Sequence, residues 1–112
     1  MTKNIQNVEE AKETIKTNNI VLFMKGTKDM PGCGFSANVV QILNNLNVKY
    51  IDIDILSDDN LKESMKKFTN WPTFPQLYVK GEFVGGCDIV KEMFESGELL
   101  KLFNTKGIDV KT

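Results

Sequence analysis

One cysteine of this chain lies where a thiol could do chemistry. Cys33 follows a Pro31-Gly32 turn and precedes a stretch with helical periodicity, so it falls at the N-terminus of a predicted helix. A helix N-terminus carries roughly +0.5 charge and unpaired N–H groups, which stabilise a thiolate over a thiol. Lys25, at the end of a predicted buried strand, could add a positive charge nearby. Such a thiolate is suited to nucleophilic attack or to metal ligation.

The alternative for Cys33 is a small buried apolar residue, which is how most free cysteines behave. Gly32 and Gly34 stand on either side of it and leave the backbone and the sulfur open rather than packed. The local sequence therefore favours a reactive thiol, and it leaves attack and ligation equally open.

The residue types that are missing restrict the chemistry further. The sequence has no histidine, which excludes a Ser-His-Asp or Cys-His nucleophile, a Cys2His2 zinc site and a haem held by histidine. Two cysteines are too few for a four-thiolate metal site or for a disulfide-stapled secreted domain. The net charge is −1 and no basic stripe with interleaved aromatics occurs, so we expect no nucleic acid partner.

The sequence also indicates where the protein works. The first residues contain no apolar core of a signal peptide, and the longest apolar run, Ile20–Met24, is far too short to cross a bilayer. We therefore expect no membrane association and a reducing compartment. That compartment would be the cytoplasm, or an organelle matrix if a transit peptide has been removed.

Hydrophobic periodicity predicts the elements that must position Cys33, within one domain spanning residues 1–112. The chain begins with a helix carrying Ile5, Val8, Ala11 and Ile15, a strand at 20–24 and a helix carrying Val39 to Leu46. An alternating strand at 51–55 and a helix capped at Ser57-Asp58-Asp59 follow. The last elements are two strands about Lys80-Gly81, a helix capped by Asp88 and a helix ending near Gly107. This order implies an α/β fold with a mixed sheet and helices on both faces.

Four motifs follow one another along the chain, and they are Lys25-Gly26-Thr27, Cys33-Gly34-Phe35-Ser36, Trp71-Pro72-Thr73-Phe74-Pro75-Gln76 and Gly85-Gly86-Cys87-Asp88. Together they resemble the monothiol glutaredoxins of the CGFS type, and the similarity extends over nearly the whole chain. One tetrapeptide alone would be a weak signal, whereas four in this order are specific. The resemblance implies a thioredoxin fold with a four-stranded mixed β-sheet flanked by helices on both faces.

The resemblance also implies that the chain binds glutathione and a 2Fe-2S cluster that bridges a homodimer. In the family each subunit supplies the CGFS cysteine, here Cys33, and each bound glutathione supplies a second thiolate. This arrangement makes physical sense, because such a cluster usually takes four thiolates and one chain offers at most two. A two-fold operation doubles both the cysteine and the glutathione.

The glutathione-binding residues that the resemblance implies are Lys25, Lys62, Phe74, Cys87 and Asp88. The two lysines would pair with the glycine carboxylate, and the backbone at Phe74, before a cis proline, would pair with the cysteinyl unit. Cys87 and Asp88 would hold the γ-glutamyl end. Asp88 suits this role on physical grounds, because a carboxylate at a helix start can meet an ammonium group while free N–H groups meet a carboxylate.

Two positions leave alternatives. The position of Lys62 is commonly arginine in the family, and lysine offers a point charge in place of a bidentate fork, so it would hold glutathione more loosely or simply face solvent. Cys87 could give backbone contacts, be a small packed residue or form a disulfide with Cys33 under oxidation. We favour backbone contact with glutathione and no ligand role.

Functions from different classes fit these residues. A carrier would receive a 2Fe-2S cluster from an iron-sulfur scaffold and pass it to apo-protein recipients. An oxidoreductase would reduce protein-glutathione mixed disulfides with Cys33 as the nucleophile. A dithiol enzyme resolves its mixed disulfide with a cysteine three residues on, where this chain has Ser36, so we expect at most a weak enzyme. A redox-inert interaction module would leave the setting of Cys33 without a purpose.

Overall fold

A four-stranded β-sheet forms the centre of the protein, seen in a computed structural model that describes residues 5 and 7–110. Its strands are β1 (Ile20–Met24), β2 (Ile51–Asp54), β3 (Gln76–Val79) and β4 (Glu82–Gly85). The strand order is β2-β1-β3-β4, with β1 parallel to β2 and antiparallel to β3, and β3 antiparallel to β4. The predicted mixed sheet is confirmed.

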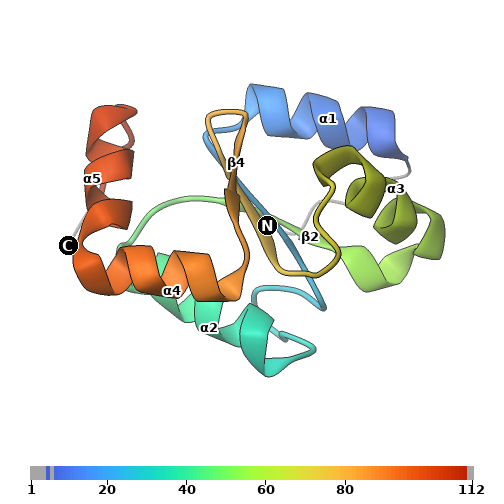
Figure 1. Ribbon diagram of the computed structural model, residues 1–112, viewed down its shortest axis with the longest axis horizontal. Helices are drawn as coiled ribbons and strands as arrows, with labels where there is room; N and C mark the ends of the chain where they lie inside the picture. Colours follow the sequence, from blue (N-terminus) through green and yellow to red (C-terminus); the bar gives the residue numbers. More distant parts are fainter. Residues whose placement is uncertain (1–4, 6, 111–112) are drawn as a thin grey trace.

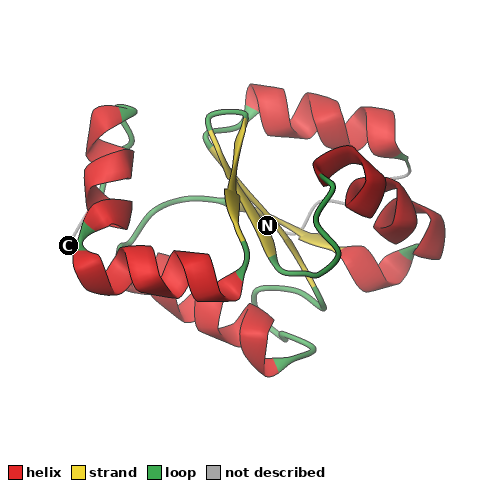
Figure 2. Ribbon diagram, in the orientation of Figure 1, coloured by secondary structure: helices red, strands yellow, loops and turns green. Residues whose placement is uncertain are grey.

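Within the described residues, five α-helices and one short 3-10 helix accompany the sheet (Figures 1 and 2). They are α1 (Val8–Thr17), α2 (Gly34–Asn45), the 3-10 helix Ile55–Ser57, α3 (Asp59–Thr69), α4 (Cys87–Ser96) and α5 (Glu98–Thr105). Over residues 5 and 7–110, no helix combines the length and the apolarity that crossing a membrane requires.

The helices cover the two faces of the sheet in separate layers, as predicted (Figure 1). All five residues of β1 are buried, because successive side chains enter opposite layers. Leu22 packs in a cluster with residues of α2, α4 and α5, such as Leu43 and Phe103. Phe23 packs with residues of α1 and α3, such as Ile15. β1 is thus fixed from both sides, which gives the residues that follow it a rigid base.

Three predicted boundaries differ from the structure, namely the start of α1, the end of β2 and the start of α4. Ile5 precedes α1, because the Asn7 side chain accepts a hydrogen bond from the Glu10 N–H (2.9 Å) and starts the helix after it, yet Ile5 is buried in the same layer. The strand predicted to Ile55 ends at Asp54, whose carboxylate accepts from the Leu56 N–H (2.9 Å) and turns the chain into the 3-10 helix.

The predicted N-cap at Asp88 is wrong, because α4 begins at Cys87 and Gly86 is its N-cap residue. Glycine is tolerated at an N-cap nearly as well as aspartate, so the extended backbone at Gly86 sets the start of the helix. Asp88 therefore lies in the first helical turn. Its carboxylate is exposed there and makes no cap for its own helix.

Candidate functional site

Cys33 occupies the position that the sequence predicted, as the N-cap residue of α2. Its backbone is extended (φ −156°), and its Sγ atom accepts a hydrogen bond from the Ser36 N–H at 3.4 Å. Cys33 is partly exposed, and a side chain at Gly34 would meet nothing within 4 Å. The thiol therefore caps the helix while it stays accessible from outside, which contradicts the alternative of a packed apolar residue.

The surroundings of Cys33 favour its thiolate form. Burial raises the pKa of the thiol, but the hydrogen bonds from the Ser36 side chain, the Ser36 N–H and the Phe35 N–H, together with the Lys25 ammonium, outweigh it. The pKa of Cys33 is therefore lowered from its ordinary value. Ser36 Oγ lies 3.4 Å from Sγ and accepts a hydrogen bond from it when Cys33 is a thiol. The same oxygen accepts from the Lys25 N–H at 3.1 Å, so the Ser36 hydroxyl keeps its own proton to donate to the thiolate.

The segment before Cys33 is a tight loop, residues 25–32, hereafter the approach loop. The Gly32 N–H donates to the Lys25 carbonyl at 2.7 Å, which closes the loop on itself. Gly26 has a φ of +86°, and a Cβ atom there would lie 2.5 Å from the Met30 carbonyl oxygen. Only glycine fits this conformation and this close approach. The loop thereby delivers Cys33 to the start of α2 in a fixed place.

Two carboxylates of β2 hold the approach loop against the sheet. Asp54 Oδ1 accepts from the Gly26 N–H at 3.0 Å, and Asp52 Oδ2 accepts from the Lys28 N–H at 2.8 Å. Asp52 is fully buried, so its hydrogen bond is shielded from water. The strand parallel to β1 therefore contributes to the placement of Cys33 through the approach loop.

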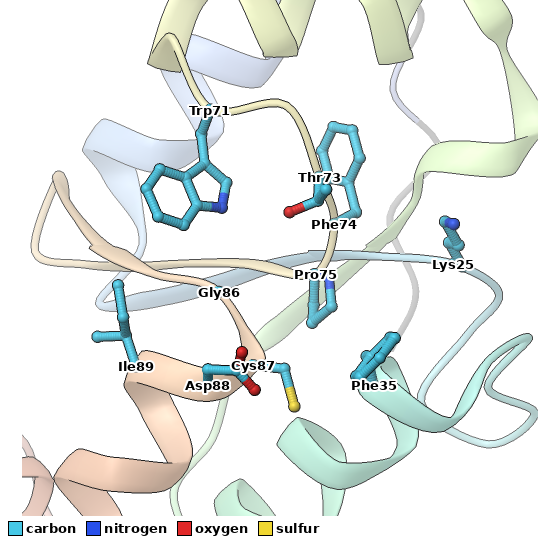
Figure 3. Close-up of a pocket in the computed structure, with 10 residues that line it drawn as sticks. All are labelled: Lys25, Phe35, Trp71, Thr73, Phe74, Pro75, Gly86, Cys87, Asp88 and Ile89. Atoms are coloured by element: carbon cyan, nitrogen blue, oxygen red, sulfur yellow. The ribbon is translucent and has the colours of Figure 1, made fainter.

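A cavity of about 530 Å³ opens beside the end of β1 (Figure 3). Its walls come from the approach loop, the start of α2, the loop before β3 and the start of α4. The residues that line it are Lys25, Phe35, Trp71, Thr73, Phe74, Pro75, Gly86, Cys87, Asp88 and Ile89. Segments far apart in the sequence thus form one concave site.

The structure brings most of the predicted site residues together. Lys25, Phe74, Cys87 and Asp88 all line the cavity. Cys33 lies beside the cavity, because it precedes the lining residue Phe35 by two positions in the chain. Neither Cys33 nor Lys62 is among the described residues that line the cavity, and Lys62 lies partly buried on α3. Its assignment stays a prediction.

Side chains that were not predicted from the sequence form much of the cavity wall. Trp71 and Thr73 belong to a motif from which only the Phe74 backbone was assigned a role, and Phe35 directly follows Cys33-Gly34. Phe35 is 61% exposed, which is unusual for a large apolar side chain. Its position beside a reactive cysteine is a sequence signal that could have indicated Phe35 as a site residue. Trp71 has no such signal, because its position depends on how its loop folds.

The buried side-chain amide of Gln76 fixes the loop before β3, residues 71–75, by hydrogen bonds. Gln76 is fully buried, and its Nε2 donates to the Thr69 Oγ1 (3.3 Å), the Trp71 carbonyl (3.3 Å) and the Thr73 carbonyl (3.2 Å). The Tyr78 hydroxyl donates to its Oε1 at 3.1 Å. The Phe74–Pro75 peptide bond in this loop is cis, as the resemblance implied.

The start of α4 forms the opposite wall. No side chain of the described residues caps this helix, so the first N–H groups at Cys87 and Asp88 are left for another partner. Gly86 permits the close packing here, because a Cβ atom would come within 3.3 Å of both the Pro75 carbonyl and the Trp71 Nε1 atom. Cys87 is 8% exposed, and both it and Cys33 are free thiols.

The donor set of the described part of the chain contains no group of three or more histidine, cysteine, aspartate or glutamate residues placed to hold a metal ion. Cys33 is the more accessible of the two thiols, since Cys87 is buried in the cavity wall. One chain thus presents a single accessible thiol at this site among its described residues.

Comparison with known proteins agrees with this geometry. The family profile named Glutaredoxin matches residues 20–84. Probable monothiol glutaredoxin 2 of Rickettsia typhi is 59% identical over 100 residues, which cover 89% of this chain and 87% of that protein. A monomeric truncated mutant of Trypanosoma brucei 1-C-Grx1 has a TM-score of 0.88 at 37% identity, covering 96% of this chain and 98% of that one.

A buckwheat glutaredoxin, solved as a complex with glutathione, shares the fold at 24% identity with a TM-score of 0.78, over 89% of each chain. The thioredoxin fold that the resemblance implied is confirmed by these structural neighbours. With a family profile that covers more than half of its residues and with monothiol relatives along most of its length, the chain belongs to the glutaredoxin family, as a monothiol glutaredoxin.

Proposed function

We propose that this monothiol glutaredoxin binds glutathione in the cavity beside Cys33 and carries a 2Fe-2S cluster between a scaffold and apo-protein recipients. The observation that carries the proposal is the setting of Cys33, a stabilised and accessible thiolate with a serine where a resolving cysteine would be. A thiolate that cannot be consumed by an internal disulfide at that position stays available to a metal.

The cavity suits an elongated tripeptide with charged ends. Lys25 lies at one side of it and Asp88 at the other (Figure 3). The Lys25 ammonium would pair with the glycine carboxylate, and Asp88 with the ammonium of the γ-glutamyl residue. The free N–H groups at the start of α4 would bind the neighbouring carboxylate, because a helix N-terminus attracts anions. Glutathione binding by the buckwheat glutaredoxin of the same fold supports this assignment.

The cluster is cargo in this proposal, and the thiolates available favour a shared site. A 2Fe-2S cluster takes about four thiolates, and the accessible thiol of one chain supplies one of them. Two copies of the chain would supply two Cys33 thiolates, and two glutathione molecules would supply the others. Such sharing needs a two-fold arrangement of the subunits, which is the commonest symmetry of homo-oligomers.

The second candidate is reduction of protein-glutathione mixed disulfides, which the lowered pKa of Cys33 favours. The Cys33 thiolate would attack the glutathione sulfur and break the disulfide, and the freed protein thiolate would take up a proton. A glutathione thiolate would then attack the Cys33-glutathione disulfide, regenerate Cys33 and leave as oxidised glutathione. Ser36 cannot perform this second attack, so turnover would depend on free glutathione and be slow.

Anaerobic reconstitution tests the carrier proposal. The protein is incubated with ferrous iron, sulfide and glutathione, and the product is followed by visible absorbance and size-exclusion chromatography. We expect a coloured dimer whose colour depends on glutathione. Cys33→Ser should stay colourless, whereas the matched variant Cys87→Ser should colour fully, because the Cys87 thiol is buried in the cavity wall while Cys33 is accessible.

A colourless monomer from the wild-type protein would refute the carrier proposal. A mixed-disulfide reductase assay run on the same preparations separates the two candidates. High turnover by the colourless protein would favour the enzyme, and slow turnover beside full cluster loading would favour the carrier.

A further inference from the structure

The indole N–H of Trp71 is a buried donor without a hydrogen-bond acceptor among the described residues. A buried N–H that gives up its bond with water and gains none in the protein destabilises the fold, so native proteins rarely keep one without a reason. Trp71 is also the only tryptophan of the chain. Its N–H group is therefore an unexplained feature of a residue that lines the cavity.

The Trp71 N–H is placed toward the start of α4. A Cβ atom built on Gly86, the N-cap residue of α4, would lie 3.3 Å from the Trp71 Nε1 atom. Figure 3 shows the nitrogen-bearing edge of the indole turned into the cavity, between Thr73 and Gly86. The absence of a side chain at Gly86 thus leaves this donor next to the first N–H groups of the helix.

The indole is held in that orientation by the loop that carries it. The Gln76 amide donates to the carbonyls of Trp71 and Thr73, and the Trp71 backbone N–H donates to the Thr69 Oγ1 at 3.2 Å. The ring packs edge-on against Phe83, with a centroid distance of 5.7 Å. A donor fixed in this way is ready for a ligand and need not be ordered when the ligand binds.

Three kinds of group meet at this corner of the cavity, and together they define the ligand. The Trp71 N–H and the backbone N–H groups at Cys87 and Asp88 are donors, which a carboxylate would satisfy. The exposed Asp88 carboxylate beside them would repel a lone anion and attract a cation. A group that carries a carboxylate and an ammonium on one carbon, the α-amino acid end of a peptide, satisfies both.

We propose that the Trp71 indole N–H donates a hydrogen bond to the α-carboxylate of the γ-glutamyl residue of glutathione. The proposal rests on glutathione binding as proposed above and adds Trp71 as a residue that selects this end of the ligand. The carboxylate then has a side-chain donor in addition to the helix N-terminus. A tripeptide without that carboxylate gains no hydrogen bond from Trp71, so this donor favours glutathione over it.

The test compares two peptides on two proteins by isothermal titration calorimetry. The peptides are glutathione and its γ-aminobutyryl analogue, which lacks only the α-carboxylate. Trp71→Phe keeps an aromatic ring against Phe83 and removes the donor. We expect this variant to bind glutathione about tenfold more weakly, the loss of one hydrogen bond to a charged group. Its affinity for the analogue should equal that of the wild type, because the group that Trp71 would bind is missing.

A control variant and a spectroscopic signal separate this role from a structural one. Phe83→Leu disturbs the packing of the ring but keeps the donor, so it should weaken both peptides by the same factor. Because the chain has one tryptophan, its ¹⁵N-labelled form gives one indole cross-peak in NMR spectra. That peak should shift downfield with saturating glutathione and stay near its free position with the analogue.

Each outcome decides the proposal. If Trp71→Phe weakens both peptides equally, or if the indole peak responds equally to both, the donor role of Trp71 is wrong while glutathione binding stands. If the wild-type protein binds neither peptide, glutathione binding fails and this inference fails with it. A selective loss for glutathione, with a selective indole shift, supports both.

Discussion

At the scale of single residues, Cys33 owes its chemistry to a serine three positions on. Ser36 is fully buried and meets Cys33 twice, through its backbone N–H and through its hydroxyl. In a dithiol protein a cysteine at this position would compete for the Cys33 sulfur. Here the residue instead stabilises the thiolate and cannot form a disulfide with it, which suits the proposed role of Cys33 as a ligand.

Ser36→Ala should raise the pKa of Cys33, because the variant loses the hydroxyl that hydrogen bonds with the sulfur. Because the pKa of Cys33 is lowered, the wild-type protein keeps its thiolate at pH values below the ordinary pKa of a cysteine. Its reactivity falls only when the pH drops through the lowered pKa. In the variant that fall should occur at higher pH, so alkylation at neutral pH becomes slower. The pH profile of iodoacetamide alkylation, measured on protein with Cys87 replaced by serine, reports this.

Ser96→Ala is the matched control for that experiment, because it removes an exposed serine hydroxyl at the end of α4, away from Cys33. Its alkylation profile should match that of the wild type. A Ser36→Ala profile that overlays both would show that the backbone N–H groups and Lys25 alone set the pKa of the thiol.

At the scale of elements, the approach loop and the loop before β3 decide the shape of the site, and both are fixed by groups outside them. Asp52 and Asp54 of β2 hold the first loop, and Gln76 of β3 holds the second. Carboxylates and amides can do this because each can accept or donate several hydrogen bonds, and those of Asp52 and Gln76 are also shielded from water. The sheet therefore organises the site as well as the core.

Gly26→Ala should destabilise the protein far more than Gly97→Ala, although the two glycines have nearly the same φ, +86° and +84°. At Gly97 a Cβ atom would meet nothing within 4 Å, so alanine there costs about 1 kcal/mol for the left-handed conformation. At Gly26 the Cβ atom would also collide with backbone atoms of Met30 and Gly32, which brings the loss to about 3 kcal/mol. Urea unfolding of both variants measures the difference, and equal losses would contradict the close approach.

Asp54→Ala should lower the free energy of unfolding by about 2 kcal/mol, because two backbone N–H groups lose their acceptor. Both bonds end on the same oxygen, Oδ1, so Asp54→Asn keeps an acceptor in place and should recover more than half of the loss. The pair is compared by urea unfolding. If the asparagine variant is as unstable as the alanine variant, the negative charge, and not the hydrogen bonds, fixes the approach loop.

Periodicity was enough to predict the elements, but their ends depended on local hydrogen bonds. The uniform run Ile20–Met24 indicated a strand covered on both faces, and β1 is that strand. The strand expected to reach Ile55 stops at Asp54 because its carboxylate caps the next turn. The cap expected at Asp88 moves to Gly86, since cap preferences differ by only about 1 kcal/mol and packing against the Trp71 loop outweighs that.

The sequence could indicate Lys25, Cys33, Cys87 and Asp88 as residues in or beside the cavity wall, but not most of the other residues of that wall. Cys33 could be placed because turn residues and a helical stripe mark its position directly. The roles of Trp71 and Thr73 depend on a loop whose conformation is set by Gln76 beneath it, a tertiary contact that no local pattern contains. Lys62 came from the family resemblance alone, and the cavity wall does not include it among the described residues.

At the scale of the whole molecule, the surface around Cys33 decides what can approach the thiol. Phe35 and Met30, which flank Cys33 in the sequence, are 61% and 79% exposed, so two large apolar side chains reach solvent near the thiol. A thiolate on an open apolar surface can be approached by another protein or by a copy of the same chain. The proposed sharing of a cluster between two copies makes use of this exposure.

The ratio of iron to protein in the reconstituted species tests this sharing directly. If the cluster bridges two chains, the coloured fraction should contain roughly one iron, one sulfide and one glutathione per chain, and it should elute as a dimer. If one chain alone held the cluster, with glutathione or other small thiols completing the ligands, the ratio would be roughly two irons per chain in a coloured monomer. Iron and glutathione analysis of the eluted peak distinguishes the two arrangements, because Cys33 can contribute to a second chain's cluster only when the chains elute together.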